Sequence, residues 1–145
     1  MGADVSRDTI DAKGRLAIPA GARKAAGKSA WFMLVPGFEG CLALYDDVQW
    51  TRVEERLQRL GWGRKERAFK RALLLHAVRV TVDAQGRVTI PPALMSRAGL
   101  GKEATLHGVG DHIEIWNPDR LGAVIKEAQA NFEANAEDVL GEPNE

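Results

Sequence analysis

Cysteine is nearly absent from this chain, which has only Cys41 among 145 residues. A disulfide framework within the chain is therefore excluded, and the composition fits a reducing compartment such as the cytoplasm. The first thirty residues contain no long apolar run, so we expect neither a signal peptide nor a membrane span. The formal net charge is zero, so the mean charge does not by itself indicate a nucleic-acid-binding protein.

The sequence also lacks the patterns of catalysis and of metal binding. It contains no nucleophile–base motif and no phosphate-binding glycine loop. The candidate soft metal ligands are Cys41, His76, His107 and His112, and they do not have the spacing of a metal site. We therefore expect a protein that is not an enzyme and has no metal, cofactor or small-molecule substrate. An enzyme would need a pocket that holds an acidic or basic side chain with a shifted pKa.

The sequence does contain one segment that occurs twice. Residues 7–19 and 79–91 are identical at eight of thirteen positions and lie 72 residues apart. Two copies at so long a spacing do not suggest a solenoid. They predict two half-domains that pair with each other. Each half alone, at about 70 residues, would be marginally stable, which favours mutual burial of the two halves.

Each copy predicts a tight hairpin around the sequence Asp-Ala-x-Gly-Arg. Aspartate suits the first position of a type I turn, and Gly14 or Gly86 suits the left-handed residue that closes it. Around each turn, aliphatic residues alternate with polar ones, as Leu16 follows Arg15. Each copy should therefore bury an apolar face and present an arginine-bearing face.

The rest of each copy predicts short helices and strands around a mainly β core, hence an α+β fold. Prolines after each hairpin favour a short helix, with Gly27 and Gly99 as C-caps. The expected strands cover residues 31–35, 41–45, 104–106 and 113–116, and the expected longer helices cover 48–60, 64–76 and a segment from about 120. The expected domains are residues 5–60, a linker and basic helix at 61–76, residues 77–130, and an acidic tail at 131–145 whose end we expect to be disordered.

The charges are unevenly distributed along the chain. Residues 1–28 hold six Lys or Arg and three Asp, and residues 52–71 hold eight Lys or Arg and three Glu. Residues 103–145 hold two Lys or Arg and ten Asp or Glu. This polarity predicts a head-to-tail contact between copies of the chain, acidic end to basic helix, although the basic run also suits a solvated helix face. Removing residues 134–145 should change assembly only slightly if that tail is disordered.

Arg15 and Arg87 are the central candidates for a DNA contact. Arginine presents a planar fork of donors that suits phosphate and the O6 and N7 atoms of guanine. The alternative is an internal salt bridge to Asp11 or Asp83 across the hairpin. The two roles can coexist if each aspartate supports and orients its arginine.

The first copy is the more basic one. Lys13 stands where the second copy has Gln85, and Arg23-Lys24 stand where it has Met95-Ser96. A phosphate-binding face should therefore come mainly from the first copy, with the second chiefly a structural partner, although Arg23 and Lys24 also fit ordinary helix solvation. The candidate DNA-binding residues are Arg7, Lys13, Arg15, Arg23, Lys24 and Arg87.

Further segments accompany the repeated motif. Gly40–Tyr45 follows the first copy, His107–Trp116 follows the second, and the basic stretch 64–71 lies between them. With these segments, the tandem Asp-x-x-Gly-Arg-aliphatic-x-Ile-Pro motif resembles the MraZ family, in which two AbrB-like (SpoVT-AbrB) half-domains are fused in one chain. The resemblance covers about residues 5–120.

The resemblance implies an intramolecular swapped-hairpin β-barrel flanked by helices. It also implies a cytoplasmic, nucleoid-associated transcriptional regulator of the bacterial division and cell-wall gene cluster. Such a protein would form ring-shaped homo-oligomers and bind direct repeats of a short G-rich box in double-stranded promoter DNA. Two alternatives stay open: an AbrB-type antitoxin whose acidic tail binds a toxin, and an interaction module that restrains a neighbouring enzyme.

Overall fold

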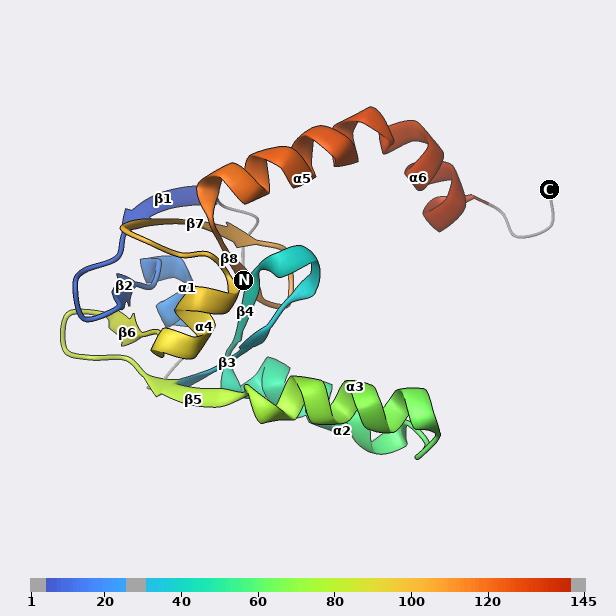
Figure 1. The fold of residues 1–145 in the computed structure, drawn as a ribbon, viewed down its shortest axis with the longest axis horizontal. Coiled ribbons are helices and arrows are strands. Elements are labelled where there is room, and N and C mark those ends of the chain that lie inside the picture. The colour runs from blue at the N-terminus through green and yellow to red at the C-terminus, as the bar shows by residue number, and fades with distance from the viewer. Residues whose placement is uncertain (1–4, 26–30, 142–145) are drawn as a thin grey trace.

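The computed structural model describes residues 5–25 and 31–141, which form antiparallel sheets and helices (Figure 1). The strands are β1 Val5–Thr9, β2 Arg15–Ala17, β3 Trp31–Pro36, β4 Leu42–Tyr45, β5 Val78–Thr81, β6 Arg87–Thr89, β7 Glu103–Gly108 and β8 Ile113–Trp116. The helices are α1 Ala20–Ala25, α2 Asp47–Arg59, α3 Arg64–Leu75, α4 Pro92–Arg97, α5 Pro118–Ala130 and α6 Phe132–Leu140, with a 3-10 turn at Phe38–Gly40. The predicted α+β class is confirmed.

The two halves exchange strands. The larger sheet has the order β1-β7-β8-β4-β3-β5, and the smaller one pairs β2 with β6. Strand β1 of the first copy thus pairs with β7 of the second, and β5 of the second copy pairs with β3 of the first. Every pairing is antiparallel, and β4 and β8 meet at the centre. Both sheets contain strands from both halves, which confirms the predicted pairing of half-domains. Closure of the sheets into a barrel stays a prediction.

Strand alternation divides the apolar residues between the two faces of the larger sheet. Phe32 and Leu34 point to the main core, which also contains Leu16 and Val88 of the small sheet. Val35, one residue out of phase with Leu34, packs on the opposite face with Trp50 of α2. The period of two therefore places the small sheet and short helices on one face and the long helices on the other.

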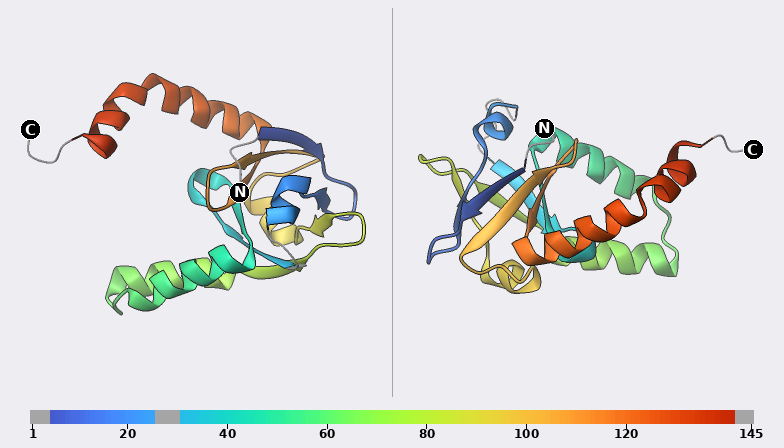
Figure 2. Two further views of the ribbon diagram at one scale, coloured as in Figure 1. Left: turned by 180° about the vertical axis from the view of Figure 1, so that it is seen from behind. Right: turned by 90° about the horizontal axis from the view of Figure 1, so that it is seen from above.

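Helices α2 and α3 form a pair that extends beyond the sheet (Figures 1 and 2). Helix α2 begins after Asp46, whose Oδ1 accepts a hydrogen bond from the Gln49 amide at 2.8 Å, as expected for an N-cap. The turn into α3 is held by Lys70, a buried lysine whose Nζ donates to the Leu60 carbonyl at 3.2 Å. The same Nζ lies 4.1 Å from the centroid of the Trp62 ring, so the buried charge is compensated.

The C-terminal helices α5 and α6 form an arm that leaves the sheet on the same side as the α2–α3 pair (Figures 1 and 2). Helix α5 is capped by Asn117 and packs through Leu121 against the sheet. The sequence did not predict α6, which continues the helical arm to Leu140. The expected disorder at the end of the tail concerns residues 142–145, which lie outside the described part of the chain. The predicted C-cap Gly27 also lies outside it. The other predicted C-cap, Gly99, has the expected positive φ of 62°.

Candidate nucleic-acid interface

The two hairpin turns lie at the end of the molecule opposite to the helical arm and the α2–α3 pair (Figures 1 and 2). In the first turn the Gly14 amide donates to the Asp11 carbonyl at 3.0 Å, and Gly14 has a φ of 79°. In the second turn the Gly86 amide donates to the Asp83 carbonyl at 3.0 Å, with a φ of 78°. These are the predicted turns, each closed by a left-handed glycine.

Each turn aspartate binds the backbone and the side chain of its arginine. Asp11 Oδ1 accepts from the amides of Lys13 at 3.0 Å and Arg15 at 2.9 Å, and Asp11 Oδ2 lies 2.5 Å from Arg15 Nε. Asp83 repeats the pattern, with Arg87 Nε at 3.2 Å from its Oδ2. The Arg15 amide is the largest cause of a lowered pKa at Asp11, and the Arg87 amide has the same effect on the pKa of Asp83.

The arginines of the two copies belong to one cluster. Pairing of β2 with β6 sets Leu16 opposite Val88 in the core, so Arg15 and Arg87 lie on the outer face of the same small sheet. Arg87 Nη1 also lies 3.5 Å from Asp11 Oδ2, so Asp11 contacts both arginines. The side chains stay accessible, 35% exposed for Arg15 and 27% for Arg87.

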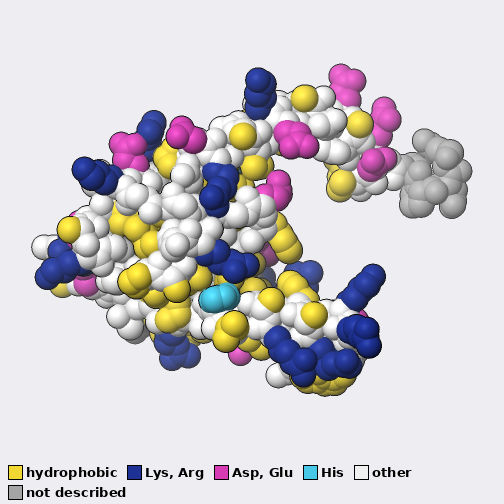
Figure 3. Space-filling view, in the orientation of Figure 1, with side chains coloured by type: hydrophobic (Ala, Val, Ile, Leu, Met, Phe, Trp, Pro, Cys, Tyr) yellow, Lys and Arg dark blue, Asp and Glu magenta, His cyan; other side chains and the backbone are white. Residues whose placement is uncertain are grey.

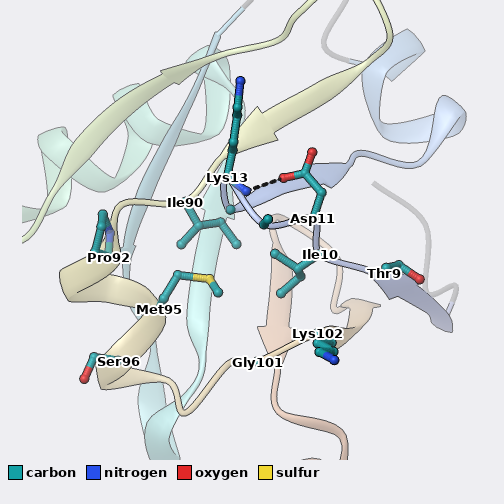
Figure 4. A pocket seen from close by; sticks show the side chains of 12 residues that line it. Thr9, Ile10, Asp11, Lys13, Ile90, Pro92, Met95, Ser96, Gly101 and Lys102 are labelled. Atoms are coloured by element: carbon teal, nitrogen blue, oxygen red, sulfur yellow. Dashed lines mark hydrogen bonds between the residues drawn. The ribbon is translucent and has the colours of Figure 1, made fainter.

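Lys13 lies at the exposed tip of the first turn, beside a groove of about 710 Å³ (Figure 4). Ile10, Ile90 and Met95 point into this groove, whereas the Lys13 side chain points away from it. Lys102 lies at the rim and adds a cation that the sequence reasoning did not single out.

The other candidate residues have different surroundings. Arg7 lies on the edge strand β1 and forms an exposed ion pair with Glu103 at 2.8 Å. Arg23 lies beside the turn of the other copy, at Gly86. Lys24 is in α1, but its side chain lies outside the described part of the structure. Arg7 and Arg23 thus contact different parts of the second copy, Glu103 and the Gly86 turn.

Arg120 is a structural arginine that the sequence reasoning missed. Its Nη1 donates to the Gly40 carbonyl at 2.8 Å and to the Arg97 carbonyl at 3.4 Å, so it ties α5 to both halves. The sequence predicted a helix from about residue 120 but not where this side chain would reach. Within residues 5–25 and 31–141, no group of three or more His, Cys, Asp or Glu could hold a metal ion. None of the helices described there is long and apolar enough to cross a membrane.

Comparison with known proteins agrees with the motifs. Residues 3–72 and 73–142 each match the family "MraZ protein, putative antitoxin-like". The chain is 41% identical to the transcriptional regulator MraZ of Ligilactobacillus salivarius, over 92% of this chain and 93% of that one. It is 39% identical to the MraZ regulator of Pediococcus pentosaceus, over 91% and 92% of the two chains. MraZ transcriptional regulators are not enzymes. Since both halves match one after the other and the relatives are covered almost end to end, the chain belongs to the MraZ family of transcriptional regulators and carries two tandem MraZ repeats.

Proposed function

We propose that this chain regulates transcription by presenting the Arg15–Arg87 cluster to double-stranded promoter DNA. The observation that carries the proposal is the contact of Asp11 with both arginines, at 2.5 Å and 3.5 Å, on an accessible face at one end of the molecule. Two guanidinium groups held together in this way lose less side-chain entropy on binding to phosphates or base edges than two mobile ones.

The aspartates orient the arginines in this proposal. Asp11 and Asp83 accept hydrogen bonds from the Nε atoms of Arg15 and Arg87. The terminal Nη groups are then the donors directed at a guanine edge or a phosphate. Lys13, at the tip of the first turn, adds a phosphate contact, whereas Arg7 would have to leave its ion pair with Glu103 to make one.

The DNA target that we propose is a set of direct repeats of a short G-rich box, ahead of the bacterial division and cell-wall genes. Membership of the MraZ family supports this choice. The proposed location is the cytoplasm, at the nucleoid. The exchanged strands and shared core also support the finer fold proposal, a closed barrel of swapped hairpins.

We also propose that copies of the chain assemble head to tail into a ring. Lys and Arg side chains gather at the end of the α2–α3 pair, and Asp and Glu lie along the α5–α6 arm (Figure 3). Both surfaces expose large apolar residues: Trp62 and Leu75 on one, Phe132, Val139 and Leu140 on the other. Opposite charges and unpartnered apolar groups on two different surfaces support a heterologous contact, which closes into a ring when the rotation allows it.

An antitoxin remains the second candidate, because the family description includes that role and the exposed acidic arm could bind a partner protein. The same arm would serve a module that restrains a neighbouring enzyme. These alternatives do not need the arginine cluster to face DNA.

The decisive experiment measures fluorescence anisotropy of a labelled promoter fragment with direct G-rich repeats, at two salt concentrations. We expect tight binding that falls steeply between about 50 and 200 mM salt, because phosphate contacts release counterions. A fragment of equal length with scrambled boxes is the control and should bind more weakly. Absent binding, or binding that salt does not weaken, would contradict the proposal.

A further inference from the structure

The two hairpin turns rest on different supports, although their sequences are alike. Beside the second turn, Arg23 Nε donates to the Ile18 carbonyl at 3.1 Å. Its guanidinium lies so close to Gly86 that a methyl group there would be 2.5 Å from Nη1 and 2.6 Å from Cζ. Arg23 belongs to the first copy and Gly86 to the second, so the brace links the two halves.

Among the described residues, no side chain braces the first turn in the equivalent way. Met95 occupies the position equivalent to Arg23, 72 residues later, and it points with Ile90 into the open groove (Figure 4). A methyl group at Gly14 would meet the Ile90 carbonyl oxygen at 2.8 Å, the equivalent of the carbonyl that accepts from Arg23. A guanidinium therefore lies against the second turn, whereas a groove of about 710 Å³ lies beside the first.

We propose that Arg23 is a positioning residue for Arg87: by bracing the Gly86 turn, it holds the second arginine of the cluster in its DNA-binding orientation. This proposal rests on the proposed function, since it assumes that Arg87 contacts DNA. Arg23 itself then makes no DNA contact, in contrast to the interpretation of the sequence, which placed it on a phosphate-binding face.

The physical basis is the order that Arg23 imposes on a short turn. Gly86 directly precedes Arg87, and the Asp83 carboxylate that holds Arg87 belongs to the same turn. The Arg23 guanidinium, which is hydrogen-bonded to Ile18 and lies against Gly86, limits the backbone motion that glycine otherwise permits. Without it, the turn samples more conformations, and Arg87 loses orientation that must be restored when DNA binds.

The first test needs no DNA. In Arg23→Met, which installs the residue found at the equivalent position, amide hydrogen exchange should become faster at Gly86 and Arg87 and stay unchanged at Gly14 and Arg15. Arg97→Met removes an exposed arginine from the equivalent helix α4 and is the matched control. Unchanged exchange at Gly86, or an equal increase at both turns, would overturn the brace.

The second test separates positioning from direct contact by combining Arg23→Met with each cluster mutation. In the Arg15→Ala background, Arg23→Met should weaken DNA binding by about 3- to 10-fold. This loss is a fraction of the binding free energy of one bidentate arginine–guanine contact. In the Arg87→Ala background it should have almost no effect, because the residue being positioned is gone.

A direct phosphate contact gives the opposite result. Arg23→Met would then cost the same in both backgrounds, and the salt slope of log affinity would fall by about 0.9. That outcome would overturn the proposal. If wild-type protein fails to bind DNA at all, the proposed function fails, whereas the exchange experiment still decides whether Arg23 braces the turn.

Discussion

At Asp11, a single carboxylate joins the two repeats. It accepts two backbone amides of its own turn and contacts Arg15 and, across the small sheet, Arg87. The salt bridge and the DNA-binding role considered from the sequence therefore remain compatible, since the bridge fixes the arginine and leaves it accessible. The equivalent aspartate of the second copy, Asp83, contacts Gln85 and Arg87 of its own turn.

The first prediction compares the two arginines. Arg15→Ala should weaken DNA binding more than Arg87→Ala, because the first turn also carries Lys13, where the second carries Gln85. Loss of an arginine that reads a base edge costs about 1–3 kcal/mol. Titration of the promoter fragment, with a melting curve for each variant, measures both effects. Equal losses of affinity, or a lower melting temperature with unchanged affinity, would contradict the prediction.

The second prediction concerns pH. Hydrogen bonding from the Arg15 amide, helped by the Arg15 guanidinium, lowers the pKa of Asp11 in the folded protein. The ionised carboxylate therefore stabilises the fold above the pKa of the unfolded chain, about 3.9, and this contribution disappears as pH falls through the lowered folded value.

Asp11→Asn should accordingly reduce the free energy of unfolding at pH 7, and its difference from wild type should shrink as pH falls below about 4. Urea denaturation at several pH values measures this difference. Asp138→Asn, on the exposed helix α6, is the control and should stay close to wild type at each pH. A difference that is independent of pH would show that the charge of Asp11 does not matter.

Among the elements, the two turns are the ones that the sequence predicted most fully. The order Asp-Ala-x-Gly-Arg specifies a hydrogen-bonded turn from local contacts alone, and the structure has both turns as expected. Helix α2, expected from residue 48, begins at Asp47 after a locally bonded cap for the same reason. Helix α6 was missed because its sequence is acidic and lies outside the repeated pattern.

The third prediction tests the turns by glycine substitution. Gly14→Ala should cost about 1–2 kcal/mol for the left-handed backbone, and more because its methyl group would meet the Ile90 backbone oxygen at 2.8 Å. Gly86→Ala should cost less, since the atoms it meets belong to the Arg23 side chain, which can shift at the cost of its hydrogen bond to Ile18, whereas a backbone oxygen cannot. Gly101→Ala, which has open space, should stay within about 0.5 kcal/mol of wild type. Urea denaturation measures the free energy of unfolding of each variant. A larger loss of stability in Gly86→Ala than in Gly14→Ala would refute the prediction.

At the scale of the whole molecule, the proposed binding and assembly surfaces lie at opposite ends. The turns face one way, and the arm and the α2–α3 pair face the other (Figures 1 and 2). A subunit could therefore bind DNA through its turns while it contacts neighbours through its helices. Repeated subunits on consecutive boxes would gain affinity from their high effective concentration.

The fourth prediction concerns assembly. The expected small effect of removing residues 134–145 depended on disorder, whereas residues 132–140 form helix α6, with Phe132 69% and Leu140 82% exposed. We now expect Phe132→Ser with Val139→Ser to lower the mass measured by light scattering, because the apolar contact with a neighbour is lost. Asn135→Ser on the same helix is the control. A wild-type monomer at micromolar concentration and moderate salt would refute ring assembly, and an unchanged mass in the double variant would refute the arm contact.

The sequence by itself determined the repeats, the two turns, the strand faces and the family, because each depends on short spacings along the chain. A hydrogen bond from Arg15 to Asp11 spans four residues, and alternation of Leu16 with Arg15 needs only neighbours. The tertiary structure alone decided that β2 pairs with β6, which brings Arg87 to Asp11 and Arg23 to Gly86. Two nearly identical hairpins offer the same local pattern to either half, so only long-range strand pairing and the shared core select the exchanged arrangement.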